Sequence, residues 1–487
     1  MTLQLCDQLN LHARTRPDAT AACRAGGEAP EALTFSDLAA RVSAIAATAE
    51  FGQPAGVVLL RYPNRPEFLA GFFGVLAAGG TVFPIAAGST VPETTSAAAR
   101  SGAAAAIVAR SDAPLLQSSF RQSRAFPEFS GDAMLLFDPV WTARTADGPA
   151  LLLQSSGTTG TPKIVRRDGA SLDAVARAMV NGCGFSAADH VLAGVPLCHS
   201  YGMEHGVLAP VWAGSCVHVL ERFDLAAAIG ELRAGGITML PGVPFMFEML
   251  SRATGPFPTL RRVYSAGGPL PRSTFDSFVT AFGLRIGQVY GATEIGSVTF
   301  NNPDDPEFDP ASVGAALEGV TVRILDADDP HVARPLPTGN RGQVAIAAQS
   351  MLSGYVDGEP PPLLEGHYLT GDLGVLDARG RLAITGRLNL LIDIGGRKVN
   401  PAEVENVLRL HPGVGACVVI PMRLSETVCR LKAIVTPRPV DVPISAEELR
   451  RFARERLSGY KVPRIFEVRD ALPTSPSGKV LRRRVEA

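Results

Sequence analysis

The sequence predicts an α/β protein with a large N-terminal body of mostly parallel sheets flanked by helices, a β-rich subdomain and a small α+β C-terminal lobe. Three observations predict this organisation. Short β-rich runs alternate with helical apolar patterns in the first part of the chain, as in parallel sheets. From about Ser312 the runs are instead separated by Gly and Pro. The 487 residues also exceed what one hydrophobic core normally holds, so we expect at least two domains.

The N-terminal body begins with a helical pattern over residues 35–49, for which Ser36 or Asp37 is the expected N-cap. A strand over 55–60, a helix over 68–78 and a strand over 81–85 follow. The further β-rich runs cover residues 104–108, 191–195, 216–220, 238–240, 262–265 and 285–289.

The β-rich subdomain is predicted from strands over residues 319–325, 342–346 and 381–386. After Arg387 we expect a helix near Asn400, strands over 416–420 and 430–436, and a helix that begins at Ser445. Ser445 with Glu448 fits a capping box, and Asn400-Pro401 with Glu403 fits the N-cap, N1 and N3 positions of a helix.

The overall charge is nearly balanced, at −1, and gives no reason to expect nucleic-acid binding. Its distribution is uneven: residues 388–487 contain 18 Lys and Arg against 11 Asp and Glu, a net of +7, and the rest of the chain carries −8. A small basic segment suits a polyanionic ligand or an acidic partner protein. The simpler alternative is a solvated surface.

The seven cysteines are scattered and form no C-x-x-C pair, which argues against a disulfide framework and a zinc site and favours a reducing compartment. The N-terminus lacks a basic stretch followed by an apolar one, and no run of 18 apolar residues occurs. We therefore expect a cytoplasmic protein without a signal peptide or a membrane span.

A loop rich in hydroxyl groups follows an apolar strand at Leu153. Glycines allow backbone N–H groups to approach phosphate oxygens, hydroxyls add donors, and lysine adds positive charge. The loop does not match the Walker A pattern, which argues against a P-loop kinase or ATPase. A surface loop is the alternative. The candidate nucleotide-binding residues are Ser155, Ser156, Gly157, Thr158, Thr159, Gly160 and Lys163.

The stretch Ser155–Lys163 resembles the phosphate-binding signature of the acyl-adenylating superfamily, which includes acyl- and aryl-CoA synthetases, non-ribosomal peptide adenylation domains and beetle luciferases. The resemblance covers about residues 10–487 and is closest to stand-alone acyl- or aryl-CoA ligases and acyl-carrier-protein ligases. It implies that ATP and Mg²⁺ activate a carboxylic acid as acyl-AMP, which then forms a thioester. The family often has Gly where this chain has Ile164, a change that we expect to be tolerated.

Tyr290-Gly291-Ala-Thr293-Glu294 matches the superfamily's Tyr-Gly-x-Thr-Glu motif. The resemblance implies that Tyr290 and Gly291 border the nucleotide, Thr293 contacts the α-phosphate and Glu294 helps to hold Mg²⁺. Mg²⁺ is a hard cation that is usually held by one or two carboxylates together with phosphates. A glutamate after a strand is otherwise often a capping or surface residue.

Two further motifs match ribose-binding positions of the superfamily. Tyr368-Leu-Thr-Gly-Asp372 implies that Asp372 accepts hydrogen bonds from the ribose hydroxyls, as the two oxygens of a carboxylate can do. Thr385-Gly-Arg387 implies that Arg387 also reaches the ribose. The alternative for Asp372 is an Asx turn beside Gly371.

The resemblance places a hinge at Asn389, where the superfamily usually has Asp or Lys. It implies an adenylating domain over residues 1–387 and a mobile lobe over 388–487. Gly395 and Gly396 would admit a pantetheine arm in the thioester step. The near-terminal Ser-Gly-Lys479 implies that Lys479 bridges the substrate carboxylate and the nucleotide, because two anions that react need a cation between them. A lysine in a mere tail is the alternative.

The acyl pocket is predicted from a stretch at Pro196 that resembles acyl- and aryl-CoA ligases. There His199 and Tyr201 would border the acyl group, although His199 is equally explained as a packed histidine. Other positions that resemble pocket-lining and adenine-flanking residues are Gly242, Ala266 and Gly267. No Asp occurs between residues 195 and 213, so an amino acid is a less expected substrate.

The sequence ends soon after Lys479, so we expect the acceptor thiol to come from coenzyme A or a separate phosphopantetheinyl carrier protein. Two alternatives stay open. The chain activates an amino acid for a separate peptidyl carrier protein, or it has lost catalysis and binds only a nucleotide or a carrier. The joint presence of Thr293, Glu294, Asp372, Arg387 and Lys479 argues against lost catalysis.

Overall fold

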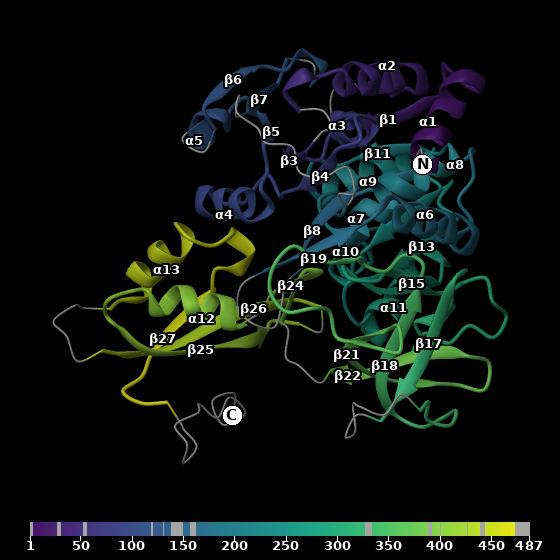
Figure 1. Ribbon diagram of the computed structural model, residues 1–487. Helices are drawn as coiled ribbons and strands as arrows, with labels where there is room; N and C mark the ends of the chain where they lie inside the picture. Colours follow the sequence, from purple (N-terminus) through teal and green to yellow (C-terminus); the bar gives the residue numbers. More distant parts are fainter. Residues whose placement is uncertain are drawn as a thin grey trace. The chain divides into compact units, whose positions relative to one another are not determined.

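The computed structural model (Figure 1) divides the chain into two compact units, described here separately. The larger unit comprises residues 1–87, 98–154 and 164–388, and the smaller comprises residues 88–97, 155–163 and 389–487. The residues that the structure describes are 3–26, 31–51, 56–117, 120–129, 131–137, 150–155, 162–326, 334–387, 392–399, 401–425, 427–438 and 444–472.

A 14-stranded sheet forms most of the larger unit, and its central strands are parallel. Five of these central strands agree closely with predicted runs, whereas the strand Thr20–Arg24 and the edge strand Ala32–Thr34 were not predicted. In sheet order they are β14 (Ile286–Ala292), β13 (Arg262–Ser265), β12 (Met239–Gly242), β10 (His190–Ala193), β11 (Cys216–Val219) and β1 (Thr20–Arg24), with β2 (Ala32–Thr34) antiparallel at the edge.

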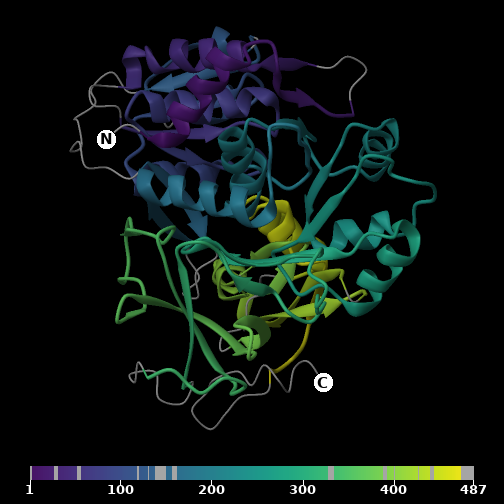
Figure 2. The same ribbon diagram turned by 90° about the vertical axis from the view of Figure 1, so that its right-hand side faces the viewer.

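The other end of this sheet is antiparallel and is drawn in green (Figure 2), as the change of pattern at Ser312 predicts. Beyond β14 it continues through β15 (Gly296–Asn301), β16 (Gly314–Ala316), β22 (Arg381–Arg387), β21 (His367–Leu376), β18 (Gly342–Ala348) and β17 (Val320–Leu325), and β20 (Leu363–Leu364) pairs with β21.

A second sheet has eight strands. Its order brings together segments from across the sequence, because β19 (Gly354–Tyr355) pairs with β9 (Lys163–Arg167). The remaining strands, in order, are β8 (Leu151–Ser155), β4 (Thr81–Pro84), β3 (Val57–Arg61), β5 (Ala105–Ala109), β7 (Ala133–Phe137) and β6 (Gln122–Ala125).

Helices surround the two sheets, and one continuous hydrophobic core includes residues of both sheets and of the first helices. Helix α3 (Pro66–Ala77) is buried along nearly its whole length, which explains why its sequence is apolar on all sides. The other helices of the larger unit are α1 (Gln4–Thr15), α2 (Phe35–Ala46), α5 (Ala113–Leu116), α6 (Gly169–Cys183), α7 (Ser200–Met203), α8 (Ala209–Ala213), α9 (Leu225–Ala234), α10 (Pro244–Leu250) and α11 (Arg272–Phe282), with short 3₁₀ turns at Ala49–Phe51 and Pro127–Phe129. Helix α4 (Val91–Ser101) is divided between the two units, with residues 91–97 in the smaller one.

The predicted N-cap of α2 is wrong. The helix begins at Phe35 and its N-cap is Thr34, whose hydroxyl accepts a hydrogen bond from the Asp37 N–H at 3.0 Å. The Asp37 carboxylate in turn accepts from the Thr34 N–H, so Asp37 is the N3 partner in a capping box. The reciprocal box at Thr34 satisfies two N–H groups, which a cap at Ser36 or Asp37 would not.

The smaller unit contains a three-stranded sheet of β25 (Val414–Arg423), β26 (Cys429–Pro437) and β27 (Ile465–Val468), and a hairpin of β23 (Ile392–Ile394) and β24 (Arg397–Val399). Helices α12 (Pro401–Arg409) and α13 (Ala446–Arg454) contribute to the same core as the sheet, and a 3₁₀ turn covers Gly459–Lys461. The Ser445 hydroxyl accepts from the Glu448 N–H at 3.1 Å, which confirms this predicted cap. Asn400 lies outside the described residues.

These features confirm the predicted mixed α/β fold with a separate small C-terminal domain. All seven cysteines are free thiols. In the described part of the chain, every helix is too short or too polar to span a bilayer.

Candidate active site

The predicted site residues of the larger unit follow the carboxyl ends of neighbouring parallel strands. Gly242 ends β12, Ala266 follows β13, and Tyr290 lies near the end of β14. Gly242 and Ser265 are partners in the sheet, and the Ala266 N–H donates to the Gly242 carbonyl at 3.1 Å. In open α/β sheets, ligands bind at the carboxyl ends of the strands, so the topology brings these residues to a plausible binding edge.

The segment after β13 makes a sharp turn at this edge. Gly267 has φ +83°, a left-handed conformation that favours glycine. The Ser265 hydroxyl just before it is buried and has no hydrogen-bond partner among the described residues. A buried polar group of this kind calls for an explanation, and a ligand at the sheet edge provides one.

A hairpin between β14 and β15 carries Thr293 and Glu294 in its turn, and both residues are half-buried. The pairing is irregular at Gly291, where a Cβ atom would lie 2.3 Å from the carbonyl oxygen of Gly296. Only glycine therefore fits this position without moving the backbone. The hairpin holds the two predicted phosphate- and metal-binding residues next to each other.

Two tyrosines lie beside Glu294. The Tyr355 hydroxyl donates to the Glu294 carboxylate at 3.5 Å and is 3.4 Å from the Tyr368 hydroxyl. Burial, and then the charge of Glu294, raise the pKa of both tyrosines well above the usual value, so both stay protonated. Tyr355 was not predicted, because it lies outside any recognisable motif.

The predicted ribose-binding residues face each other across two strands. Asp372 on β21 and Arg387 on β22 are partners in the sheet register. The Tyr290 hydroxyl donates to Asp372 Oδ2 at 2.8 Å, and the Asp372 N–H donates to the Thr370 hydroxyl at 3.1 Å. Tyr290 and Asp372, which belong to different motifs, are thus brought into direct contact. The side chain of Arg387 lies outside the described part.

A small cavity lies near the predicted acyl pocket, with a volume of about 10 Å³, which is room for one water molecule at most. Tyr201 lines it, whereas His199 precedes helix α7 and is not among the lining residues. The roles of Tyr201 and His199 at an acyl pocket stay predictions. The lining residues are Ala193, Val195, Tyr201, Gly202, His205, Gly206 and Pro241.

A buried ion pair lies behind this cavity and joins three elements. Glu204 is in the π-helical segment η4 (Glu204–Leu208), and its Oε1 lies 3.4 Å from Arg167 Nη1 of β9. Its other oxygen accepts from the N–H and the hydroxyl of Ser297 on β15, at 2.8 and 2.7 Å. The ion pair therefore links the pocket-lining helix to the hairpin that carries Glu294.

His205 extends this network. Its Nδ1 lies 2.9 Å from the Tyr264 hydroxyl, and its Nε2 lies 3.1 Å from the Ser297 hydroxyl. Burial lowers the pKa of His205 to about 3, so the imidazole that lines the cavity is neutral. Glu204 and His205 were not predicted from the sequence. The signal that could have pointed to them is that they are two polar residues in an otherwise apolar helical run.

The phosphate loop lies largely outside the described residues. Those outside are Ser156, Gly157, Thr158, Thr159 and Gly160, and also Asn389 and Lys479.

The two ends of the phosphate loop are described. Ser155 ends β8 and Lys163 begins β9, and these two strands are neighbours in one sheet. The Ser155 hydroxyl is buried without a partner among the described residues. Ile164, at the position where a glycine was expected, is fully buried, so its apolar side chain is accommodated in the core.

Gly395 and Gly396 form the turn of the β23–β24 hairpin in the smaller unit. Their φ values are +61° and +84°, and the Gly396 N–H donates to the Asp393 carboxylate at 2.8 Å. The exposed Gly395 leaves backbone open to approach. The proposed role of these glycines in the thioester step stays a prediction.

Comparisons with known proteins identify the family of the chain. Residues 9–356 match the family described as AMP-binding enzyme, and residues 403–479 match the AMP-binding enzyme C-terminal domain. A feruloyl-CoA synthase of an Amycolatopsis species is 29% identical, with 96% of each chain covered. The fatty acid–[acyl-carrier-protein] ligase ScoC of Streptomyces coeruleorubidus is 31% identical, with 71% of this chain and 68% of the relative covered.

The fold has a close structural counterpart. The o-succinylbenzoate CoA synthetase of Bacillus subtilis superposes with a TM-score of 0.85 at 24% identity, and the match covers 98% of both chains. On the two family matches, which together include most of the sequence, the chain belongs to the AMP-binding enzyme family.

Proposed function

We propose that the protein uses ATP to convert a carboxylic acid to acyl-AMP with release of pyrophosphate, and then transfers the acyl group to a thiol to form a thioester. One observation carries this proposal: the Tyr290–Asp372 hydrogen bond joins a ribose-binding motif to the hairpin that bears Thr293 and Glu294. The named activities of the two sequence relatives, a CoA synthase and a carrier-protein ligase, support the same class of reaction.

Asp372 orients the nucleotide in this proposal. A carboxylate has several acceptor positions, so Asp372 can accept from Tyr290 and from ribose hydroxyls together. Arg387, its partner across the sheet, is proposed to contact the ribose as well. Thr293 in the hairpin turn donates to the α-phosphate.

Glu294 fits a Mg²⁺ ligand. Its carboxylate is a hard oxygen donor in a half-buried turn, and Tyr355 orients one of its oxygens. When bound, Mg²⁺ supplies positive charge that neutralises the phosphates.

The first step is a displacement at phosphorus. An oxygen of the substrate carboxylate forms a bond to the α-phosphorus, the bond from this phosphorus to the bridging oxygen breaks, and pyrophosphate leaves. Lys479 is proposed to lie between the two reacting anions, where a compact charge stabilises the transition state. Positioning and electrostatics suffice, and the enzyme forms no covalent intermediate.

The second step needs a different set of residues. We propose that the lobe over residues 388–487 turns about Asn389 and brings the Gly395–Gly396 turn toward the adenylate. The sulfur of the acceptor attacks the acyl carbon, the carbon–oxygen bond to phosphate breaks, and AMP leaves. The thiol proton is released.

We propose that the part of the acyl group that enters the acyl pocket carries no charge. Glu204 is the one acidic residue between positions 195 and 213, and it is already paired with Arg167 and Ser297, so it does not serve as a partner for a substrate ammonium group. His205 is neutral. Both facts favour an acyl or aryl acid over an amino acid.

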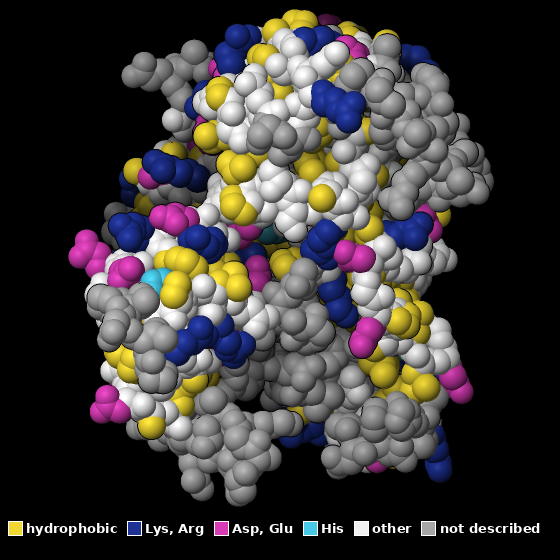
Figure 3. Space-filling model, turned by 60° about the vertical axis from the view of Figure 1, so that its left-hand side comes forward, with side chains coloured by type: hydrophobic (Ala, Val, Ile, Leu, Met, Phe, Trp, Pro, Cys, Tyr) yellow, Lys and Arg dark blue, Asp and Glu magenta, His cyan; other side chains and the backbone are white. Residues whose placement is uncertain are grey.

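The acceptor is proposed to be coenzyme A or a carrier protein. The net charge of +7 over residues 388–487 overstates the free basic surface, because Lys461 is buried and donates to Glu403 at 2.7 Å. On the face in Figure 3, Lys and Arg side chains are interspersed with Asp and Glu side chains. The basic segment suits the phosphates of coenzyme A and an acidic carrier protein alike.

A hydroxamate screen tests the proposal. The protein is incubated with ATP, Mg²⁺, hydroxylamine and aryl, short-chain or medium-chain acids, and AMP and ADP are measured. We expect acid-dependent hydroxamate and AMP with at least one acid class, and formation of both that is roughly 10- to 100-fold slower at low ATP with Asp372→Ala. Formation of ADP, or hydroxamate that is independent of Asp372, would contradict the assignment. Addition of coenzyme A or of a carrier protein to the active mixture then identifies the acceptor.

A further inference from the structure

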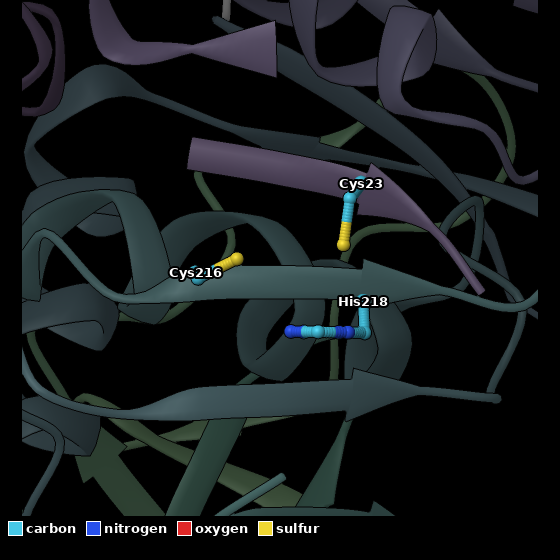
Figure 4. A group of neighbouring side chains, drawn as sticks. All are labelled: Cys23, Cys216 and His218. Carbon is cyan, nitrogen blue, oxygen red and sulfur yellow. The ribbon is translucent and has the colours of Figure 1, made fainter. Parts of the chain in front are cut away.

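Two cysteines and a histidine that are far apart in the sequence meet on one face of the large sheet. Cys23 is on β1, and Cys216 and His218 are on β11 (Figure 4). One ligand atom from each residue, the two sulfurs and an imidazole nitrogen, lies within 4.8 Å of the others. Among the described residues, these three form the one group of at least three His, Cys, Asp or Glu side chains whose ligand atoms lie close enough to share a metal ion.

The sheet register explains why these side chains share a face. Cys23 and His218 are direct partners in the parallel pairing of β1 and β11. Cys216 is two residues before His218, and side chains two apart on a strand point to the same side. His190 on β10 is the partner of Cys216, so it also points to this face. The arrangement follows from the regular backbone of three neighbouring strands and needs no unusual conformation.

The surroundings of His218 leave one of its nitrogens available for a ligand. His218 Nε2 lies 2.9 Å from His190 Nδ1, so a hydrogen bond between them occupies this nitrogen. His218 Nδ1 lies 3.7 Å from Glu231 Oε2 of helix α9. The other oxygen of Glu231 accepts from the Gly26 N–H at 2.8 Å, which orients the carboxylate. Partners of this kind set the orientation of metal ligands in known sites.

We propose that Cys23, Cys216 and His218 bind a zinc ion, with Glu231 as the fourth ligand. Two sulfurs, one imidazole nitrogen and a carboxylate are the donors that Zn²⁺ accepts in tetrahedral sites. Zinc–ligand bonds of about 2.0–2.3 Å require only that the side chains close on a central ion. The ion has access, because the side chains of His218 and Glu231 are 19% and 27% exposed.

Zinc binding at this cluster needs no redox step. A thiolate is the form of cysteine that binds metal. Binding releases the thiol protons to solvent and leaves the protein's oxidation state unchanged. None of the four ligands belongs to the active site described above.

The consequence of zinc binding is structural. β1 and its partner β2 lie at one edge of the large sheet, next to β11. An ion held by β1, β11 and α9 would tie this edge to the body. The absence of a C-x-x-C pair in the sequence argued against a zinc site, whereas the pairing of β1 with β11 brings Cys23 next to Cys216 and His218.

The experiment uses the full chain, stripped of metal with a chelator under reducing conditions, then incubated with zinc and freed of excess ion. We expect one zinc ion per chain by elemental analysis, protection of two thiols from a thiol reagent, and a higher Tm. Cys23→Ser, Cys216→Ser and His218→Gln should each lose the zinc and the Tm increase. Cys429→Ser, which changes a thiol in the smaller unit, is the matched control and should keep both.

Cobalt binding to the unaltered chain provides a measurement that does not depend on the stability of the variants. Co²⁺ should produce thiolate-to-metal charge-transfer absorption and the intense visible bands of a tetrahedral site. The proposal is wrong if the unaltered chain binds no zinc, if cobalt shows only the weak spectrum of octahedral coordination, or if the serine variants bind zinc as the parent does. A disulfide between Cys23 and Cys216 that persists in reducing buffer would also contradict the proposal, because it leaves neither sulfur free to bind zinc.

Discussion

Asp372 is oriented in part by a tyrosine from another motif. The Tyr290 hydroxyl donates to its carboxylate, and the Thr370 hydroxyl accepts from its backbone N–H. Both contacts involve residues of the recognised motifs. The motifs predicted that Tyr290 and Asp372 each lie near the nucleotide, but their direct contact was not predicted and is visible only in the fold.

Replacement of Asp372 by alanine should weaken the use of ATP. A hydrogen bond to a charged group contributes about 1.5–3 kcal/mol, so we expect kcat/KM for ATP to fall roughly 10- to 100-fold. Tyr290→Phe should give a smaller loss in the same direction, because it removes only the orienting hydroxyl. Steady-state kinetics with varied ATP measure both effects. Asp276→Asn, on the exposed surface of α11, is the control and should be unchanged.

The buried His205 predicts a pH dependence of stability. Burial lowers the pKa of His205 to about 3, whereas the unfolded chain has a value near 6.5. Below about pH 6.5 the unfolded chain binds a proton that the folded chain does not. As the pH is lowered below about 6.5, the free energy of unfolding should therefore decrease by up to about 1.4 kcal/mol per pH unit, until the pKa of the folded chain is reached.

His205→Gln removes this titration while it can keep a hydrogen bond to Tyr264 or Ser297. The Tm of the variant should decline less steeply than that of the parent between about pH 6.5 and pH 4.5. Thermal unfolding followed by fluorescence at several pH values gives both slopes. Parallel slopes would show that His205 is not the group responsible.

At the scale of elements, the β14–β15 hairpin combines the substrate-facing residues with the buried network. Its turn carries Thr293 and Glu294, and Ser297 just after the turn binds Glu204 and His205. Strand β14 was predicted from the β-rich run at residues 285–289, whereas β15 was not predicted. The π-helical segment η4 was not predicted either, because it depends on burying Glu204 opposite Arg167, a residue from a distant strand.

Gly291→Ala tests this hairpin. The added Cβ would lie 2.3 Å from the Gly296 carbonyl oxygen, so the two strands must separate locally. A displacement of catalytic groups by about 1 Å can lower the rate by roughly 100-fold, and we expect a loss of this order in adenylation. Gly230→Ala, on helix α9 with nothing within 4 Å of the added atom, should retain full activity. Full activity of Gly291→Ala would contradict the proposed geometry.

At the scale of the whole molecule, the two proposed half-reactions use different residues. The sequence predicted the fold class and the positions of many strands, since those features depend on local pattern, and the roles of the motif residues at the nucleotide stay predictions. The sequence could not predict Tyr355 beside Glu294, the Arg167–Glu204 pair or the cluster at Cys23, because each requires strands to pair across long stretches of sequence.

The proposal that the two half-reactions use different residues predicts how Lys479→Ala affects each of them. If Lys479 acts only in the first step, adenylation should slow by roughly 100- to 1,000-fold, whereas transfer from a chemically prepared acyl-adenylate to the thiol should be nearly unchanged. Single-turnover assays of each half-reaction separate the two. An equal loss in both would remove the assignment of Lys479 to the first step.

The exchange of labelled pyrophosphate into ATP tests the central claim most directly, because it reports reversible formation of acyl-AMP without any acceptor. With an acid found in the hydroxamate screen, we predict exchange that requires both the acid and Mg²⁺ and that falls roughly 10- to 100-fold at low ATP in Asp372→Ala. Exchange that does not depend on acid, or its absence with every acid that supports product formation, would contradict an acyl-adenylate intermediate.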